Sequence, residues 1–256
     1  MNYTTYYNRG QRVFLINLSP DRDESVFEAF SATIMACDNT RFELRPRYNL
    51  RQGSKELPTK GMLFKVTAES FGAGVQFSGE VDTVSHNGFT LMPTGPIEMY
   101  QRSQVSRMDT TVGFRSFTRN APLEVFRQEW QHLQEGLLAG KATDLEMVPS
   151  QINLGIGGLR FMAAPDDRQY DLAMVFIQLG CDRPPICAVA EQLWHRTLPD
   201  MEGTVVGRRF VIIRKEDQLL IQRYLEQRLK KQGRRPPKPK NNWELLDRMF
   251  YSTKSC

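Results

Sequence analysis

The chain has 256 residues, of which 40% are hydrophobic and 25% charged, and its formal net charge is +5. This composition is typical of a globular protein and excludes an intrinsically disordered chain. No run of about eighteen apolar residues occurs, so the sequence predicts no transmembrane helix. The length is sufficient for one large domain or for two of ordinary size.

Cysteine and histidine spacing does not predict a metal site. No Cys-x-x-Cys pair occurs among the cysteines, which are Cys37, Cys181, Cys187 and Cys256. We therefore expect free thiols in a reducing cytoplasm, with no bound metal or cofactor. The first ten residues lack the charged and then apolar order of a signal peptide, which fits a cytoplasmic protein. The modest positive charge favours an anionic partner without identifying it.

Residues 1–98 predict a β-domain of short strands and turns, either a barrel or half of a sandwich. Residues 27–37 fit helical spacing as well as a strand, and the turn at Asp38-Asn39 that follows favours the strand. Asn87-Gly88 is typical of a type I′ hairpin turn. The predicted strands are 12–18, 27–37, 41–44, 61–68, 74–83 and 89–92.

Residues 108–232 predict a second β-rich domain that contains a helical insertion at about 121–140. Pro122 suits a first helical turn and Gly140 suits a helix end. We expect the apolar stripe of this helix to pack on the protein's own sheet, although a partner or dimer surface remains the alternative. The stripe consists of Leu123, Phe126, Trp130, Leu133 and Leu137. The predicted strands are 108–117, the two arms of a hairpin at 151–161, 170–179, 188–195 and 205–213.

A second helix is predicted at 215–231. Glu216 and Asp217 lie in its first turn, where the helix macrodipole favours acids. Its predicted apolar side consists of Leu219, Leu220, Tyr224 and Leu229.

Residues 233–256 predict a basic, proline-rich linker followed by a short terminal helix near residues 243–250. The lysines and arginines of this region support a nucleic-acid-binding alternative. No aromatic residues are interleaved with them, and blocks of like charge are usually solvated, so we favour other functions.

Two stretches have residue patterns that suit ligand binding. In the connector 99–107, Arg102 and Arg107 lie five residues apart just before a strand, and guanidinium groups bind phosphate and stack on purines. In the hairpin, Asn153 precedes a glycine-rich turn that we expect to need positive φ. Its exposed backbone N–H groups suit a phosphate or a base edge. Taken separately, a solvated loop and an ordinary hairpin are the plain alternatives.

The order of these motifs resembles the PilZ domain, the bacterial receptor fold for cyclic di-GMP. That family has Arg-x-x-x-Arg in a connector, often after Gln-Arg, and Asp/Asn-x-Ser-x-x-Gly at a hairpin. The matching segments here are Gln101-Arg102, Arg107-Met108, Asn153 to Phe161, and Val206 to Phe210 followed by the helix at 215. The strands at 1–98 resemble the accessory β-domain of flagellar-brake (YcgR-type) proteins. The resemblance extends to about Gln232.

The resemblance implies a mainly β fold. An N-terminal split-barrel-like domain (1–98) and an arginine-bearing connector (99–107) precede a six-stranded antiparallel PilZ barrel (108–232) with an inserted helix and a C-terminal helix. It also implies a cytoplasmic, non-enzymatic receptor that binds cyclic di-GMP and rearranges its domains. Such a receptor signals through a protein of the motility, secretion, polysaccharide or surface-attachment machinery. The three histidines lie far apart in sequence and beside no nucleophile motif, which also argues against an enzyme.

The arginines are expected to contact the anionic part of the ligand. By resemblance, Arg107 grips phosphates and stacks on guanine, with help from Arg102, and Arg160 adds positive charge at the rim. An ordinary surface arginine is the alternative for Arg160.

The hairpin residues are expected to contact the base. By resemblance, Asn153 faces a guanine edge, while Gly155 and Gly158 let backbone amides approach the ligand. Two positions depart from the family pattern, because Ser103 stands where the first motif arginine belongs and Gly155 where the serine belongs. These departures leave a second hypothesis, a PilZ-like adaptor that binds proteins without nucleotide.

Overall fold

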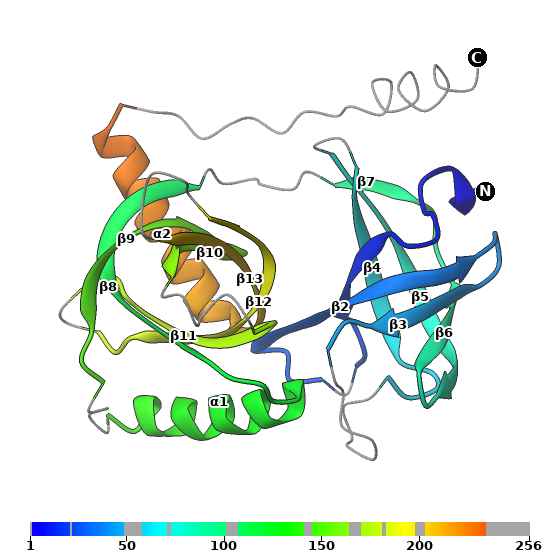
Figure 1. Cartoon of the computed structure of the whole chain (residues 1–256), viewed down its shortest axis with the longest axis horizontal. Coiled ribbons are helices and arrows are strands. Elements are labelled where there is room, and N and C mark those ends of the chain that lie inside the picture. The colour runs from blue at the N-terminus through cyan, green and yellow to red at the C-terminus, as the bar shows by residue number, and fades with distance from the viewer. Residues whose placement is uncertain are drawn as a thin grey trace. The chain divides into compact units, whose positions relative to one another are not determined.

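A computed structural model describes residues 2–20, 22–48, 58–70, 73–100, 107–140, 145–163, 170–180, 183–197 and 203–233. The chain divides into two compact units, and each is described by itself (Figure 1). Among the described residues, the first unit holds those up to Arg22 and Ala29 to Tyr100. The second holds Asp23 to Glu28 and Arg107 to Gly233. The predicted terminal helix near 243–250 lies outside the described residues.

Antiparallel strands in the first unit pair in a closed ring. The ring order is β1-β4-β5-β6-β3-β2, and β2 pairs back onto β1. The short β7 (Glu98–Tyr100) pairs with β5, and a 3-10 helix (Tyr3–Thr5) precedes β1. The strand predicted over 27–37 is confirmed. The ring strands are β1 (Arg12–Asn17), β2 (Val26–Cys37), β3 (Phe42–Pro46), β4 (Leu63–Ser70), β5 (Ala73–Ser85) and β6 (Gly88–Pro93).

The β5–β6 hairpin is confirmed, but its turn lies one residue earlier than predicted. Ser85 pairs with Gly88, so His86 and Asn87 form the two-residue turn. The φ angle of Gly88 is not positive, unlike that of a type I′ turn glycine. A Cβ at Gly88 would lie 2.2 Å from the Leu44 carbonyl oxygen. The glycine is therefore required by the close approach of β3, a tertiary constraint that the dipeptide does not reveal.

Six antiparallel strands form a closed barrel in the second unit, in the order β13-β10-β9-β8-β11-β12, with β12 pairing back onto β13. The predicted barrel, its inserted helix and its C-terminal helix are thereby confirmed. The first three residues of β2 add to the edge of β13, since Glu28 pairs with Ile212. The barrel strands are β8 (Met108–Thr118), β9 (Val148–Gly155), β10 (Gly158–Ala163), β11 (Leu172–Gln178), β12 (Ile186–Thr197) and β13 (Thr204–Arg214).

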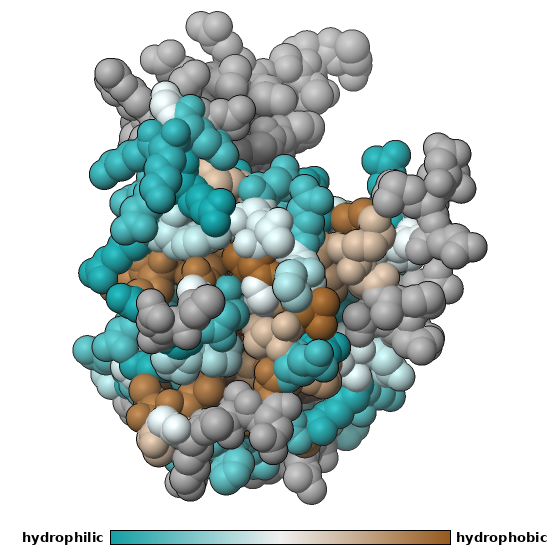
Figure 2. Space-filling model, turned by 90° about the vertical axis from the view of Figure 1, so that its left-hand side faces the viewer, coloured by the Kyte–Doolittle hydropathy of each residue, from teal (hydrophilic) through white to brown (hydrophobic). Residues whose placement is uncertain are grey.

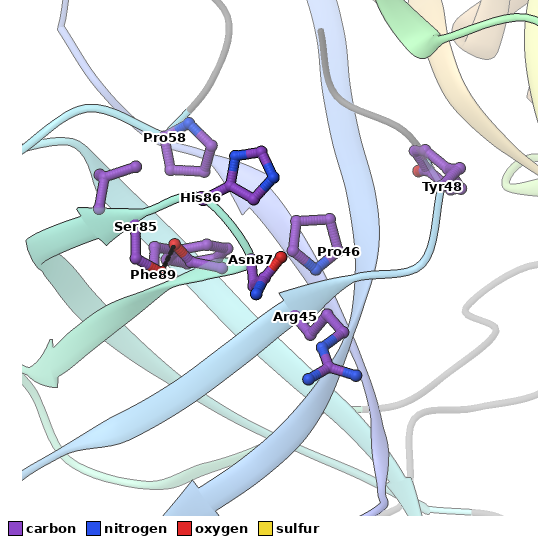
Figure 3. A pocket seen from close by; sticks show the side chains of 10 residues that line it. Arg45, Pro46, Tyr48, Pro58, Ser85, His86, Asn87 and Phe89 are labelled. Carbon is purple, nitrogen blue, oxygen red and sulfur yellow. Dashed lines mark hydrogen bonds between the residues drawn. The ribbon is translucent and has the colours of Figure 1, made fainter. Parts of the chain in front are cut away.

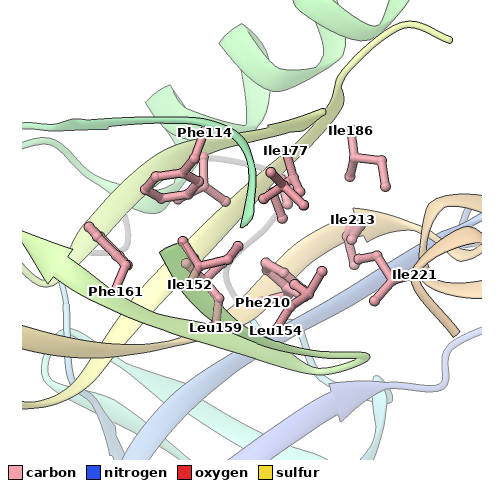
Figure 4. Packing of buried hydrophobic residues seen from close by; sticks show 14 of the residues in the cluster. Phe114, Ile152, Leu154, Leu159, Phe161, Ile177, Ile186, Phe210, Ile213 and Ile221 are labelled. Atoms are coloured by element: carbon pink, nitrogen blue, oxygen red, sulfur yellow. The ribbon is translucent and has the colours of Figure 1, made fainter. Parts of the chain in front are cut away.

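Apolar side chains from all six barrel strands form the core (Figure 4). Helix α2 (Lys215–Lys231) contributes three buried residues to it, namely Ile221, Leu225 and Leu229. The predicted apolar side was partly wrong, because Leu219 is 49% exposed. The helix starts directly after β13, so the strand fixes its rotation, and positions four residues apart from Ile221 onward meet the core.

Helix α1 (Leu123–Leu138) runs along the outside of the barrel (Figure 1), where it contacts β11 and β12. The indole Nε1–H of Trp130 donates a hydrogen bond to the Cys187 carbonyl oxygen at 2.8 Å. The Gln134 side-chain amide donates to the same oxygen at 3.1 Å. Packing of the apolar stripe on the protein's own sheet is therefore confirmed. Pro122 is the residue before the helix, not a member of its first turn, and Gly140 follows its end with φ of 68°.

The first turn of α2 shows that burial outweighs the helix macrodipole at one acid. Asp217 lies in this turn as predicted, but it is only 9% exposed. Burial raises the pKa of Asp217 to about 6, a shift that Arg214 opposes and Glu216 reinforces. The macrodipole would lower the pKa of an exposed carboxylate there, so desolvation is the larger effect at this position.

Hydrophobic residues also contribute to the surface. Figure 2 shows brown, hydrophobic patches between teal, hydrophilic side chains on the face that it views. In the second unit the exposed apolar residues include Phe117, Leu138, Met162 and Trp194. Within the described part of the chain, no helix is both long and apolar enough to cross a membrane.

Candidate ligand-binding site

The glycine-rich motif forms the β9–β10 hairpin, as predicted. Gly155 pairs with Gly158, so Ile156 and Gly157 form the turn. Of the three glycines, only Gly158 has a positive φ, 156°, and it lies at the start of β10, not in the turn. A Cβ at Gly158 would lie 2.3 Å from the Arg208 carbonyl oxygen of β13. Gly158 thus serves mainly to let β10 and β13 approach each other. The positive φ angle that we expected in the turn occurs one residue after it.

Three neighbouring strands bring polar side chains into one row on the outer face of the barrel. Asp109 of β8 pairs with Asn153 of β9, and Asn153 pairs with Arg160 of β10. The Asn153 Nδ2–H donates a hydrogen bond to the Asp109 Oδ1 atom at 2.8 Å. The Arg160 Nη2 atom lies 3.5 Å from the same Oδ1 atom. Two of the predicted ligand-binding residues therefore meet at a carboxylate that the motifs did not include.

The row continues across two more strands to an exposed aromatic residue. Arg160 pairs with Gly207 of β13, and Gly207 pairs with Trp194 of β12. A Cβ at Gly207 would lie 2.4 Å from the indole Cε2 atom of Trp194, so the indole lies directly against the glycine backbone. Trp194 is 43% exposed. The row thus ends in an aromatic surface that sequence motifs alone did not identify.

Arg107 lies against Gly155, the last residue of β9. A Cβ at Gly155 would lie 2.8 Å from the Arg107 Cγ atom and 3.4 Å from its Nε atom. The glycine that replaces the family's serine therefore makes room for the arginine side chain. Arg102 and Ser103 lie outside the described residues. The structure brings Arg107, Asn153, Gly155 and Arg160 to one outer face, with Gly158 closing the hairpin beside them.

The row borders a surface hollow of about 620 Å³. Guanidinium groups on its wall suit phosphate, the amide and carboxylate suit the polar edge of a base, and the indole suits stacking. These groups together fit an anionic nucleotide better than a neutral or cationic ligand. The polar and aromatic wall residues from the outer face are Asp109, Gln151, Asn153, Arg160, Trp194 and Arg196.

The first unit has a second hollow, of about 390 Å³, near the β5–β6 turn. Figure 3 shows Arg45 and His86 pointing away from one another across it. Side chains that diverge in this way do not offer a ligand several contacts at once, so we assign no ligand to this hollow. Among the described residues no group of three or more His, Cys, Asp or Glu side chains could hold a metal ion.

Comparison with known proteins returns PilZ-type structures along most of the chain. No family model matches the chain, and no curated protein sequence does. The Bacillus subtilis inhibitor of motility (MotI/DgrA) has 13% sequence identity and a TM-score of 0.37, covering 89% of this chain and 100% of its own. YcgR from Escherichia coli, in complex with c-di-GMP, has 14% identity and a TM-score of 0.32, covering 86% of this chain and 87% of its own.

A tetrameric PilZ domain from Xanthomonas campestris has 14% identity and a TM-score of 0.33, covering 51% of this chain and 90% of its own. All three matches are distant, with identities of 13–14% and TM-scores of 0.32–0.37. The functional assignment below therefore rests on the residues of this chain.

Proposed function

We propose that this protein is a cytoplasmic receptor and effector for cyclic di-GMP. The observation that carries the proposal is the meeting of Asn153 and Arg160 at Asp109 on an outer face of the barrel that also holds Arg107, beside Gly155, and an exposed indole. Cyclic di-GMP is a dianion with two guanine bases. It therefore needs cationic contacts for phosphate, polar contacts for base edges and flat surfaces for stacking, and the row supplies all three.

Each chemical part of the ligand has a proposed partner in the chain. Arg107 binds phosphate and stacks on a guanine, and Arg102 from the connector assists it. Gly155 leaves the space that Arg107 occupies, so the motif's missing serine is offset by a closer approach of the arginine. Arg160 contributes positive charge, and Trp194 offers its outer face to the second base.

The proposed signal is a change in the arrangement of the two units. The connector 99–107 links them and contains Arg102 and Arg107, so a ligand held by these two arginines restrains the connector. A receptor of this kind then presents a changed surface to a protein partner in motility, secretion or surface attachment.

Isothermal titration calorimetry tests the proposal. We expect cyclic di-GMP to bind the wild type at micromolar concentrations or below and Arg107→Ala at least about tenfold more weakly. That loss corresponds to about 1.5–3 kcal/mol for a charge-assisted contact. Arg223→Ala is the matched control, because Arg223 is an exposed arginine on α2.

The wild-type titration decides between the two hypotheses from the sequence. Saturable heat from the wild type and from Arg223→Ala, with weaker binding by Arg107→Ala, supports the receptor. An absence of heat from the wild type at tens of micromolar ligand contradicts it and leaves the nucleotide-independent adaptor. Equal binding by wild type and Arg107→Ala contradicts the assigned site.

A further inference from the structure

The Asp109 carboxylate lies at the centre of the proposed site and is held there by two predicted ligand-binding residues. Its Oδ1 atom accepts the hydrogen bond from Asn153 and forms the ion pair with Arg160. The side chain of Asp109 is nevertheless 63% exposed. The carboxylate is therefore oriented by protein contacts while it remains accessible to a ligand.

Structural stabilisation does not account well for this arrangement. The Arg160–Asp109 pair is solvent-exposed on both sides and separated by 3.5 Å, and exposed ion pairs of this kind contribute little to folding stability. Asp109 and Asn153 also lie directly opposite each other on adjacent strands. Apolar or β-branched residues at these two positions would stabilise the sheet more. Binding specificity is the property that such a preoriented, exposed acceptor serves.

The hydrogen-bonding pattern of guanine matches a carboxylate. The Watson–Crick edge of guanine presents two adjacent donors, N1–H and N2–H, and a carboxylate offers two adjacent acceptor oxygens. Adenine presents one donor and one acceptor on that edge, so a carboxylate meets the adenine N1 lone pair unfavourably. The Asn153 amide has one donor side and one acceptor side, so it cannot accept both guanine protons.

We infer that Asp109 is the residue that selects guanine, and that Asn153 and Arg160 position its carboxylate. This inference rests on the proposed function, because it concerns the same ligand and the same site. It changes the expected role of Asn153 from a direct base contact to a positioning residue. Oδ1 accepts from Asn153 at 2.8 Å and from Arg160 at 3.5 Å, so guanine displaces the longer Arg160 contact when both carboxylate oxygens accept from the base.

Calorimetry with two cyclic dinucleotides tests the inference. We expect Asp109→Asn to bind cyclic di-GMP about ten- to a hundredfold more weakly than the wild type, and to bind cyclic di-AMP no more weakly. Asp171→Asn is the control, because Asp171 is an exposed acid in the same unit and its substitution makes the same charge change. Asn153→Ala should lose less affinity for cyclic di-GMP than Asp109→Asn, because it leaves the carboxylate in place.

The outcomes separate this inference from the proposed function. If the wild type binds cyclic di-GMP and Asp109→Asn binds it equally or more tightly, the inference is wrong and the proposed function stands. Equal losses for both dinucleotides, or a larger loss for Asn153→Ala than for Asp109→Asn, also overturn it. If the wild type does not bind cyclic di-GMP, the proposed function fails and the inference fails with it. Thermal melts of each variant verify that the fold is retained.

Discussion

Trp194 of β12 pairs with Gly207 of β13. Because glycine has no side chain, the large indole fits against the β13 backbone. The indole packs against the glycine backbone and is still 43% exposed, so part of the ring is supported and part is available to a ligand. An unsupported exposed tryptophan would lose conformational freedom on binding, whereas this one is already oriented. The pair therefore provides a prepared stacking surface at one end of the row.

We predict that Trp194→Ala weakens cyclic di-GMP binding by about five- to 150-fold, the range that corresponds to roughly 1–3 kcal/mol for base–aromatic stacking. Trp194→Phe should retain most of the affinity. Gly207→Ala should weaken binding too, because its Cβ would displace the indole. Phe117→Ala is the control, since Phe117 is an aromatic residue of β8 that is 50% exposed and does not line the hollow. Calorimetry compares the four variants, and unchanged binding by Trp194→Ala would show that the indole is not part of the site.

Asp217 makes folding stability depend on pH. A carboxyl whose pKa is raised to about 6 in the folded state, from 3.8, binds its proton more tightly when the protein is folded. Its contribution to stability is therefore present below the unfolded pKa and is lost as pH rises through about 6. The difference corresponds to at most about 3 kcal/mol.

We predict that Asp217→Asn raises the melting temperature at pH 7 and reduces the change in melting temperature between about pH 4 and pH 6. Asp171→Asn, which removes an exposed acid, should change neither quantity appreciably. Thermal unfolding at several pH values measures both. A melting temperature at pH 7 that is lower in Asp217→Asn than in the wild type would show that the ionised carboxylate stabilises the fold.

At the scale of elements, α1 is attached to the barrel by an apolar stripe and by a shared carbonyl. Trp130 and Gln134 both donate to the Cys187 carbonyl oxygen, which is buried under the helix. This contact fixes the helix along β12, because a buried carbonyl without a donor carries a desolvation cost. Two side chains one turn apart thus determine where the insertion docks.

We predict that Trp130→Phe lowers the free energy of unfolding by about 1–3 kcal/mol, and Trp130→Ala by about 3–5 kcal/mol. Gln131→Ala, on the exposed side of the same helix, should change it by less than about 0.5 kcal/mol. Urea unfolding followed by far-UV circular dichroism measures these differences. If Trp130→Ala is as stable as Gln131→Ala, the helix is not held to the barrel by this stripe.

The elements were predictable because their signals are local. Alternation or runs of apolar and β-branched residues identified the strands except β7, whose last two residues fall in the predicted connector, and the α2 bounds at Lys215 and Lys231 follow from acids at one end and bases at the other. The rotation of α2 and the turn residues beside Gly88 were not predictable, because a strand junction and the nearby β3 backbone determine them. Local sequence contains no information about such tertiary constraints.

The same limit applies to the site. Motif order identified Arg107, Asn153 and Arg160 as candidates. Asp109 and Trp194 belong to the candidate site because of how the strands pair. Asp109 stands opposite Asn153 only because β8 and β9 pair in this alignment, and a shift of one residue would turn its side chain to the other face. The register depends on the packed barrel core as a whole, so sequence motifs do not reveal these two residues.

For the whole molecule, the proposed signal is a ligand-dependent arrangement of two compact units. We predict that saturating cyclic di-GMP changes the small-angle X-ray scattering curve of the wild type and changes that of Arg107→Ala less at the same ligand concentration. Arg223→Ala should respond as the wild type does. Identical curves with and without ligand, at a concentration where calorimetry shows the wild type saturated, would exclude a rearrangement as the signal.

The most direct test of the central claim is a two-dimensional ¹H–¹⁵N NMR titration with cyclic di-GMP. We predict that the ligand shifts the indole N–H of Trp194 and the backbone amides of Arg107, Asp109, Asn153 and Arg160. The signal of the indole N–H of Trp130, which is buried between α1 and the Cys187 carbonyl of β12, should not shift. Shifts that leave the row unaffected, or no shifts at tens of micromolar protein with excess ligand, would contradict it.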